Sequence, residues 1–190
     1  MNKKLLGILL LGFASGLPYM LVFSTLSAWL RDVGISLTEI GFFAWLVLTY
    51  SLKFLWAPFV DRYSVIGFGF LGKRRGWILF SQFMIFCSLI GMSFIDPLQN
   101  IKVLALLAFF AAFFGSIQDV AIDALRIEIG DAKEQGNLAA SYQLGYRVAI
   151  LVATSMALIF ADLLDWAYVY QLMGLLMFVG AAGALICNEP

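Results

Sequence analysis

Four ionisable residues lie inside long apolar stretches of this sequence. Lys53, Asp119, Asp123 and Arg147 each have mainly hydrophobic neighbours in the chain. A charge at the centre of a lipid bilayer costs about 3 kcal/mol by insertion scales, so such residues face a protein interior or a wet cavity and commonly line transport pathways. Two carboxylates and two cations can also neutralise each other in pairs. These residues therefore point to a transport pathway, with structural ion pairing as the alternative.

Helical spacing places several polar side chains on shared faces, because residues three and four positions apart lie on one side of a helix. One face holds Ser116, Asp119, Asp123 and Arg126, a second holds Gln143, Arg147 and Thr154, and a third surrounds Lys53 with Thr49, Tyr50 and Trp56. We predict that substrate or protons are handled by Asp119, Asp123, Arg147, Lys53 and Gln118, and that a cavity is lined by Ser15, Tyr19, Gln143 and Tyr146. A register-fixing role stays open for Lys53 and Asp123 above all.

A charged loop separates two of the apolar stretches. Asp61-Arg62-Tyr63 closes the first stretch, and Gly72-Lys73-Arg74-Arg75-Gly76 opens the next. An acidic residue at one helix end and a basic cluster at the next can act as a latch, and we expect Asp61 to pair with Arg126. The predicted gate consists of Asp61, Arg62, Arg74, Arg75 and Arg126. The alternative is that the basic cluster is only a topology signal.

The elements that position these residues must be membrane helices. The chain is 63% hydrophobic and 13% charged, with a mean hydropathy of +0.95, whereas a soluble domain is about half apolar and about a quarter charged. The formal net charge is zero, which gives no indication of a nucleic-acid partner. There is no histidine, and Cys87 and Cys187 lack the spacing of a metal site or disulfide. We therefore expect neither a metal nor another cofactor.

Six apolar stretches are long enough to cross a bilayer, which takes about 20 helical residues. They cover residues 5–30, 39–60, 77–95, 102–126, 137–161 and 166–187 approximately. The first continues too far to be the short hydrophobic core of a cleaved signal peptide. The sequence therefore predicts an all-α membrane protein, with residues 1–190 forming one six-helix transmembrane bundle.

The basic residues between the stretches indicate the orientation. One side of the membrane would carry Lys3, Lys4, Arg62, Lys73, Arg74, Arg75, Arg126 and Lys133, and the other only Arg31 and Lys102. Because basic residues concentrate on the cytoplasmic side, both termini are expected in the cytoplasm. The expected location is the inner membrane of a bacterium. The third and sixth helices, apolar nearly all round, are expected at the lipid-facing periphery, and the charged second, fourth and fifth at a cavity.

The sequence resembles the major facilitator superfamily, and within it the AmpG-type muropeptide permeases. The resemblance rests on motifs along almost the whole chain: Gly12-Phe13-Ala14-Ser15-Gly16-Leu17-Pro18, Lys53-Phe54-Leu55-Trp56-Ala57-Pro58, Asp61-Arg62-Tyr63, Arg74-Arg75-Gly76-Trp77, Gln118-Asp119, Asp123-Ala124 and Leu144-Gly145-Tyr146-Arg147. It implies the N-terminal half of a twelve-helix fold, built as a three-plus-three inverted repeat, with the first and fourth helices lining the cavity. It also implies proton-driven import of anhydro-muropeptides from periplasm to cytoplasm for cell-wall recycling.

The expected partners follow from the resemblance. They are a small muropeptide-like solute, protons, the lipid bilayer and a second six-helix half, supplied by the same polypeptide, a split gene or a second copy. An acetyl-CoA-like or other solute of the same superfamily is the alternative substrate. A non-transporting scaffold or receptor also stays open. An intramembrane protease using Asp119 and Asp123 is disfavoured, because such enzymes place their two carboxylates on different helices facing one water.

Overall fold

The structure, a computed structural model, describes residues 3–65, 72–187 and 189, and in these ranges every regular element is helical. Residues 1–2, 66–71, 188 and 190 of the expected bundle lie outside the described ranges. Six helical spans are long and apolar enough to cross a membrane: Lys3–Asp32, Leu37–Leu55, Lys73–Ser93, Pro97–Ile129, Gln135–Ala161 and Trp166–Ile186. We call them spans 1 to 6. The six-helix, all-α membrane fold expected from the sequence is confirmed.

Span 1 consists of α1 (Lys3–Met20), a π-helical turn (Leu21–Thr25) and α2 (Leu26–Asp32). Pro18 lies inside α1 and has no backbone N–H, so the carbonyl of Ala14, four residues earlier, loses its helical donor. The Nε2 of Gln118 in span 4 donates to this carbonyl at 2.9 Å. Another helix thus satisfies the carbonyl that proline leaves free, as a membrane interior requires.

Span 2 is the most irregular of the six. It contains α3 (Leu37–Phe42), a 3-10 turn (Phe43–Leu46), α4 (Val47–Ser51) and a second 3-10 turn (Lys53–Leu55), and α5 (Ala57–Arg62) follows as a separate helix. The sequence predicts one helix through residue 60. The structure breaks it at Trp56, because Pro58 is in the first turn of α5 and cannot continue a preceding helix.

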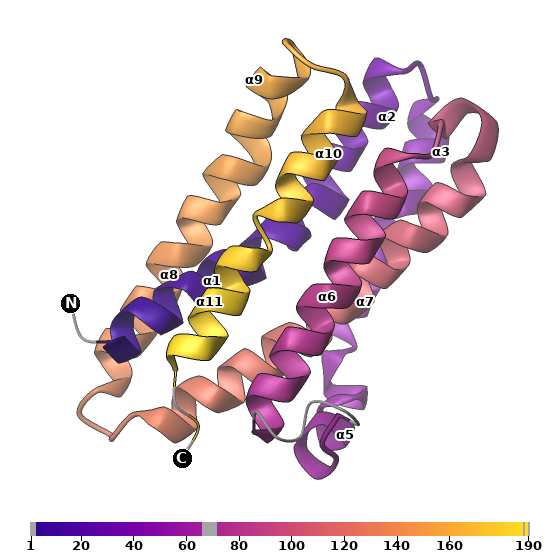
Figure 1. The fold of residues 1–190 in the computed structure, drawn as a ribbon. Coiled ribbons are helices and arrows are strands. Elements are labelled where there is room, and N and C mark those ends of the chain that lie inside the picture. Colours follow the sequence, from indigo (N-terminus) through magenta and orange to yellow (C-terminus); the bar gives the residue numbers. More distant parts are fainter. Residues whose placement is uncertain (1–2, 66–71, 188, 190) are drawn as a thin grey trace.

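Spans 3 and 4 are α6 (Lys73–Ser93) and α7 (Pro97–Ile129), which pack against each other over their length. Span 5 contains α8 (Gln135–Leu151), a π-helical turn (Val152–Met156) and α9 (Ala157–Ala161), and span 6 contains α10 (Trp166–Leu175) and α11 (Phe178–Ile186). Both termini lie at the same end of the bundle as α5, and we call this the terminal end (Figure 1).

Spans 1 and 5 approach each other closely because glycines lie at their crossing. A Cβ atom on Gly145 would collide with the carbonyl oxygen of Leu9, and one on Gly12 would collide with the carbonyl oxygen of Tyr142. The hydroxyl of Thr25 also donates to the carbonyl of Ala153, which joins the two π-helical turns. At the terminal end, the hydrogen bond and charge of Lys4 lower the pKa of Glu134, whose Oε2 lies 3.1 Å from Nζ. Span 5 is therefore attached to span 1 along its length.

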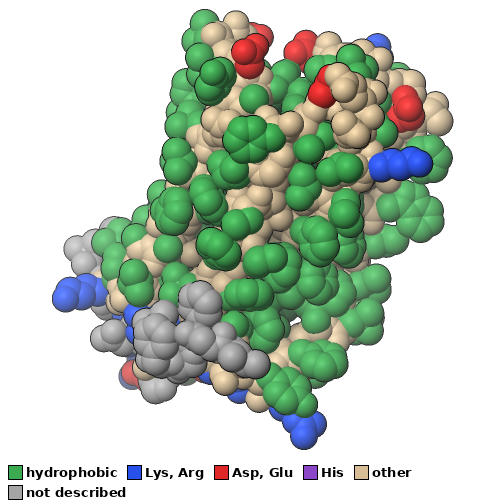
Figure 2. Space-filling model, turned by 45° about the vertical axis from the view of Figure 1, so that its right-hand side comes forward, with side chains coloured by type: hydrophobic (Ala, Val, Ile, Leu, Met, Phe, Trp, Pro, Cys, Tyr) green, Lys and Arg blue, Asp and Glu red, His purple; other side chains and the backbone are tan. Residues whose placement is uncertain are grey.

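Spans 2 and 5 have the least of their surface covered by other helices. In the most apolar window of each span, 11% of residues are buried in span 2 and 22% in span 5, against 50% in span 3, 44% in span 6 and 67% in span 1. The sequence sorted the helices by their charges, with the third and sixth at the periphery, and this sorting did not predict the difference in burial. One face of the bundle shows a broad hydrophobic belt between charged groups at its two ends (Figure 2).

Candidate functional site

The Asp119 carboxyl lies where spans 1, 4 and 5 meet. The hydroxyl of Ser15 in α1 donates to Oδ1 of Asp119, and it lies 2.7 Å from the hydroxyl of Tyr142 in α8. Ser15 is buried, and Asp119 and Tyr142 are partly buried. The close crossing at Gly12 and Gly145 allows this three-helix contact. The neutral hydroxyl of Ser15 is therefore the hydrogen-bonding partner of this carboxyl, and the Tyr142 hydroxyl extends the network through Ser15.

The other carboxylate of span 4 has a different environment. Asp123 lies 3.9 Å from Nζ of Lys53 in span 2 and 3.5 Å from Nη2 of Arg126 one turn later in α7. Asp123 thus pairs with cations, while Asp119 accepts a hydrogen bond from the Ser15 hydroxyl. The two carboxyls do not share partners as the dyad of a protease would.

Arg147 does not reach either carboxylate. Its side chain is exposed on α8, and no ion pair or hydrogen bond joins it to the residues that the structure describes. Span 5 extends about equally far on either side of this residue. The same exposed side of α8 carries Gln143. Arg147 is therefore a cation in the middle of a membrane span, available to a group outside the described chain.

The other predicted site residues lie in several environments. Gln118 is fully buried and bonded to Ala14, and its Oε1 has no partner among the described atoms. Tyr19 and Tyr146 are partly buried. Two aromatic residues were not predicted as site residues, namely Tyr50, which the sequence placed only on the face of Lys53, and Tyr142, although their hydroxyls interact electrostatically with the Asp119 carboxyl. A signal existed, since Tyr50 precedes Lys53 by three residues and Tyr142 precedes Tyr146 by four.

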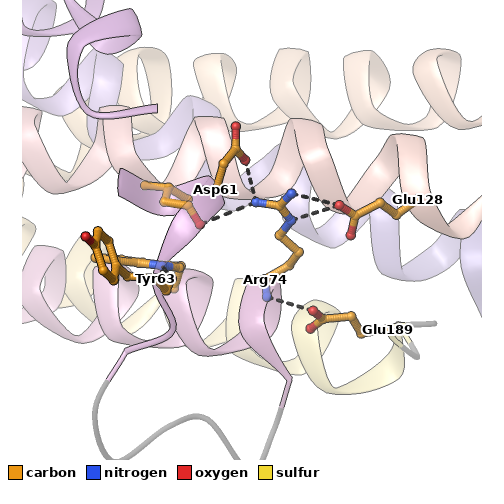
Figure 3. A network of polar contacts seen from close by, with 7 residues as sticks. Asp61, Tyr63, Arg74, Glu128 and Glu189 are labelled. Atoms are coloured by element: carbon orange, nitrogen blue, oxygen red, sulfur yellow. Dashed lines mark hydrogen bonds and ion pairs between the residues drawn. The ribbon is translucent and has the colours of Figure 1, made fainter. Parts of the chain in front are cut away.

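A charged network joins four spans at the terminal end (Figure 3). The Arg74 guanidinium, at the start of α6, donates to Oδ1 of Asp61 at 2.6 Å and to Oε1 of Glu128 in α7 at 2.8 and 3.0 Å. It also reaches the carbonyl of Val60 at 3.4 Å. The expected pair of Asp61 with Arg126 is therefore wrong. Asp61 meets the cation that follows it across the loop, and Arg126 turns to Asp123 on its own helix.

Glu189, which follows span 6, completes this network. Its carboxylate oxygens accept the backbone N–H groups of Arg74 at 2.9 Å and Arg75 at 3.1 Å. These are orphan donors of the first turn of α6, where negative charge is favoured by the helix dipole. Gly72, just before α6, has φ +103°, and a Cβ there would meet the Glu189 carboxylate. Glu128 and Glu189 were not predicted, because neither belongs to the loop.

Two predicted gate residues make other contacts. Arg75 Nη2 donates to the carbonyl of Leu185 in α11 at 3.3 Å. Arg62 lies over the ring of Tyr63, with Cζ 5.7 Å from the ring centroid. Arg75 thus adds a second link between the start of span 3 and the end of span 6. The Arg62 contact, by contrast, is with the next residue in the chain.

Comparisons with known proteins identify relatives over the whole chain. The profile of the family described as Major Facilitator Superfamily matches residues 8–190. An "Anhydromuropeptide permease" of Escherichia coli (strain K12) is 40% identical over 184 residues, which are 96% of this chain and 37% of the relative. A "Putative transporter AmpG 4" of Rickettsia felis is 32% identical over 190 residues, 99% of this chain and 46% of the relative. The chain thus spans less than half the length of these relatives.

Proposed function

Since this chain belongs to the Major Facilitator Superfamily, we propose that it forms the N-terminal six-helix half of a proton-driven transporter. The proposed cargo is an anhydro-muropeptide, imported from the periplasm for cell-wall recycling. The observation that carries this proposal is the 40% identity, over 96% of the chain, to a protein named for that permease activity. The buried polar site at the meeting of spans 1, 4 and 5 supports a transport pathway, since polar groups at membrane depth mark such pathways.

Asp119 is the proposed proton-coupling residue. A carboxyl surrounded by hydroxyls can form hydrogen bonds in both its ionised and its protonated forms, because a hydroxyl is both donor and acceptor. The Ser15 hydroxyl bonds to the Asp119 carboxyl, and the Tyr142 hydroxyl bonds to Ser15 in turn. Lys53 also interacts electrostatically with Asp119. Rearrangement of Lys53 between two open states of the transporter would change the proton affinity of Asp119 and couple it to transport.

Arg147 is the proposed anchor for a substrate carboxylate. A guanidinium binds carboxylates through two parallel hydrogen bonds, and muropeptides carry carboxylates. The exposed position of Arg147 on α8 supports this role.

The charged network at Arg74 would hold the cytoplasmic ends of the spans together and separate during the transport cycle. Uncovered surfaces on spans 2 and 5 leave room for a second six-helix half, as alternating access requires.

The test is uptake of a labelled anhydro-muropeptide into vesicles that contain the complete transporter. We expect accumulation when an inward proton gradient is imposed, and only equilibration without one. Unlabelled acetyl-CoA serves as the competitor for the alternative substrate. Absence of muropeptide uptake, or inhibition by acetyl-CoA at concentrations where unlabelled muropeptide does not compete, would contradict the proposed cargo.

A further inference from the structure

Three tyrosines lie near Asp119 and a fourth, Tyr19, contacts one of them, and the proposed function assigns no ligand to their rings. Tyr19 comes from span 1, Tyr50 from span 2, and Tyr142 and Tyr146 from span 5. The hydroxyls of Tyr50, Tyr142 and Tyr146 all interact electrostatically with the Asp119 carboxyl. Residues distant in sequence thus bring several aromatic hydroxyls to one place.

The rings form two aromatic groups, one of Tyr19, Tyr50 and Phe23 and one of Tyr142 and Tyr146, and neither group is fully covered. Tyr19 meets Tyr50 edge to face, with centroids 5.1 Å apart and planes at 88°, and Phe23 lies 4.8 Å from Tyr19. The ring centroids of Tyr142 and Tyr146 are 6.2 Å apart. All four tyrosines are partly buried, so each keeps some surface for a ligand.

One hydroxyl in this group, that of Tyr50, has no hydrogen-bond partner among the described atoms. The Tyr50 hydroxyl packs over Gly115 of α7, and it forms no hydrogen bond with the atoms that the structure describes. An unpaired buried hydroxyl costs free energy, and a ligand hydrogen bond formed when the Tyr50 ring turns to expose its hydroxyl would recover that cost. Ligand sites typically combine aromatic walls with a few such polar groups.

Resting on the proposed function, we propose that Tyr19, Tyr50, Tyr142 and Tyr146 bind the sugar part of the muropeptide. A pyranose has a face of C–H groups that suits an aromatic ring, and a rim of hydroxyl and acetamido groups that suits tyrosine hydroxyls. Arg147, next to Tyr146 on α8, would then bind a carboxylate of the same molecule. The muropeptide would thus be held by its sugar and its acidic group at separate positions.

The neighbouring charges favour a neutral ligand over an ammonium group. Aromatic cages also bind cations. Here, however, Lys53 already interacts with the Asp119 carboxyl, so a second cation would compete with Lys53 for that carboxyl and be repelled by it. A neutral amino sugar meets no such repulsion.

The test is direct binding of N,N′-diacetylchitobiose, a neutral amino-sugar disaccharide, to the purified complete transporter by isothermal titration calorimetry. Replacing Tyr146 by leucine, or Tyr19 by leucine on the neighbouring span, should weaken binding about tenfold, because an aromatic contact is lost. Tyr146→Phe keeps the ring and should weaken it less. Tyr168→Leu, at an exposed position on α10, is the matched control and should leave binding unchanged.

Three outcomes would overturn the proposal: no disaccharide binding by the wild type, unchanged binding by both leucine variants, or binding of lysine amide in place of the disaccharide. Failure of the proposed function looks different. In that case the vesicles take up no labelled anhydro-muropeptide, while disaccharide binding still depends on Tyr146 and Tyr19. The sugar site would then stand with another cargo.

Discussion

At the scale of single residues, two carboxylates four positions apart on one helix have opposite surroundings. Two cations, Lys53 and Arg126, face Asp123, whereas Asp119 accepts a hydrogen bond from Ser15, whose hydroxyl also meets that of Tyr142. Cations stabilise the ionised form of a carboxyl, while hydroxyls can bond to either form. The division suits Asp123 to a structural ion pair and Asp119 to proton exchange.

Replacing Asp119 by asparagine in the complete transporter is therefore expected to abolish gradient-driven accumulation and to spare exchange of substrate down its own gradient. The amide keeps the size and much of the hydrogen bonding of the carboxyl but cannot release a proton. The measurement is vesicle uptake with and without an imposed pH gradient. Asp162→Asn, in the exposed connection between spans 5 and 6, is the control. Normal accumulation by Asp119→Asn would leave Asp119 with a structural role only.

At the scale of elements, two features hold helices in position. Glycines allow α1 and α8 to cross closely, which brings Ser15 and Tyr142 into contact. At the terminal end, Arg74 binds Asp61 after span 2 and Glu128 in span 4, while Glu189 after span 6 caps α6. Spans that carry the site are thus fixed by backbone contact in the middle and by charges at one end.

The glycine crossing predicts that Gly145→Ala destabilises the bundle, because the new Cβ would collide with the backbone carbonyl of Leu9, which cannot rotate away. Overpacking of this kind costs about 1–3 kcal/mol, which should appear as a lower Tm of the purified complete protein. Gly136→Ala on the same helix has open space around its Cβ. It should keep or raise the Tm, since alanine favours helix more than glycine. Equal melting of the two variants would mean that α1 moves aside easily.

The Glu189 cap predicts faster hydrogen exchange at the start of α6 when Glu189 is replaced by alanine. Removing a helix cap costs about 1 kcal/mol, so exchange of the Arg74 and Arg75 amides should accelerate about fivefold. Glu39→Ala is the matched control, because Glu39 belongs to a capping box with Ser36 at the start of α3. It should accelerate exchange there and leave α6 unchanged. Unaltered α6 exchange in Glu189→Ala would show that water replaces the carboxylate without loss.

At the scale of the whole molecule, the charges at the two ends indicate the orientation in the membrane, and the uncovered spans indicate the surface that a second half would cover. The terminal end carries the basic cluster from Lys73 to Arg75, together with both termini. Positive residues favour the cytoplasm. Spans 2 and 5 present exposed hydrophobic side chains, among them Trp45, Leu48, Leu144 and Leu151. A second six-helix half over these surfaces would complete the transporter.

The orientation predicts that cysteines introduced at Lys73 and Asp165 react from opposite sides of the membrane. Cys87 and Cys187 are first replaced, since Cys87 is exposed. A membrane-impermeant maleimide added outside spheroplasts should label the cysteine at position 165. It should label the cysteine at position 73 only after the membrane is permeabilised. Labelling of Lys73 from outside intact cells would reverse the proposed topology.

The sequence by itself determined that the chain lies in lipid, how many helices cross the membrane and which residues are candidates for the functional site. A run of about 20 apolar residues has one stable form in lipid, a helix that satisfies its own backbone, so the six spans could be counted from composition. Asp119, Asp123, Lys53 and Arg147 were found because charges are costly there. Pro58 also marks the break after span 2, although the expected helix continued past it.

Only the tertiary structure decided the pairings. Asp61 has several basic residues within plausible reach, and the sequence favoured Arg126, whereas the fold gives it Arg74. The choice depends on how helices rotate and cross, which is set by backbone contacts such as Gly145 on Leu9. The same contacts bring Ser15 and Tyr142 to Asp119 and leave Arg147 exposed on α8. Periodicity along one helix fixes which side chains share a face, but the neighbour of that face depends on packing between distant segments.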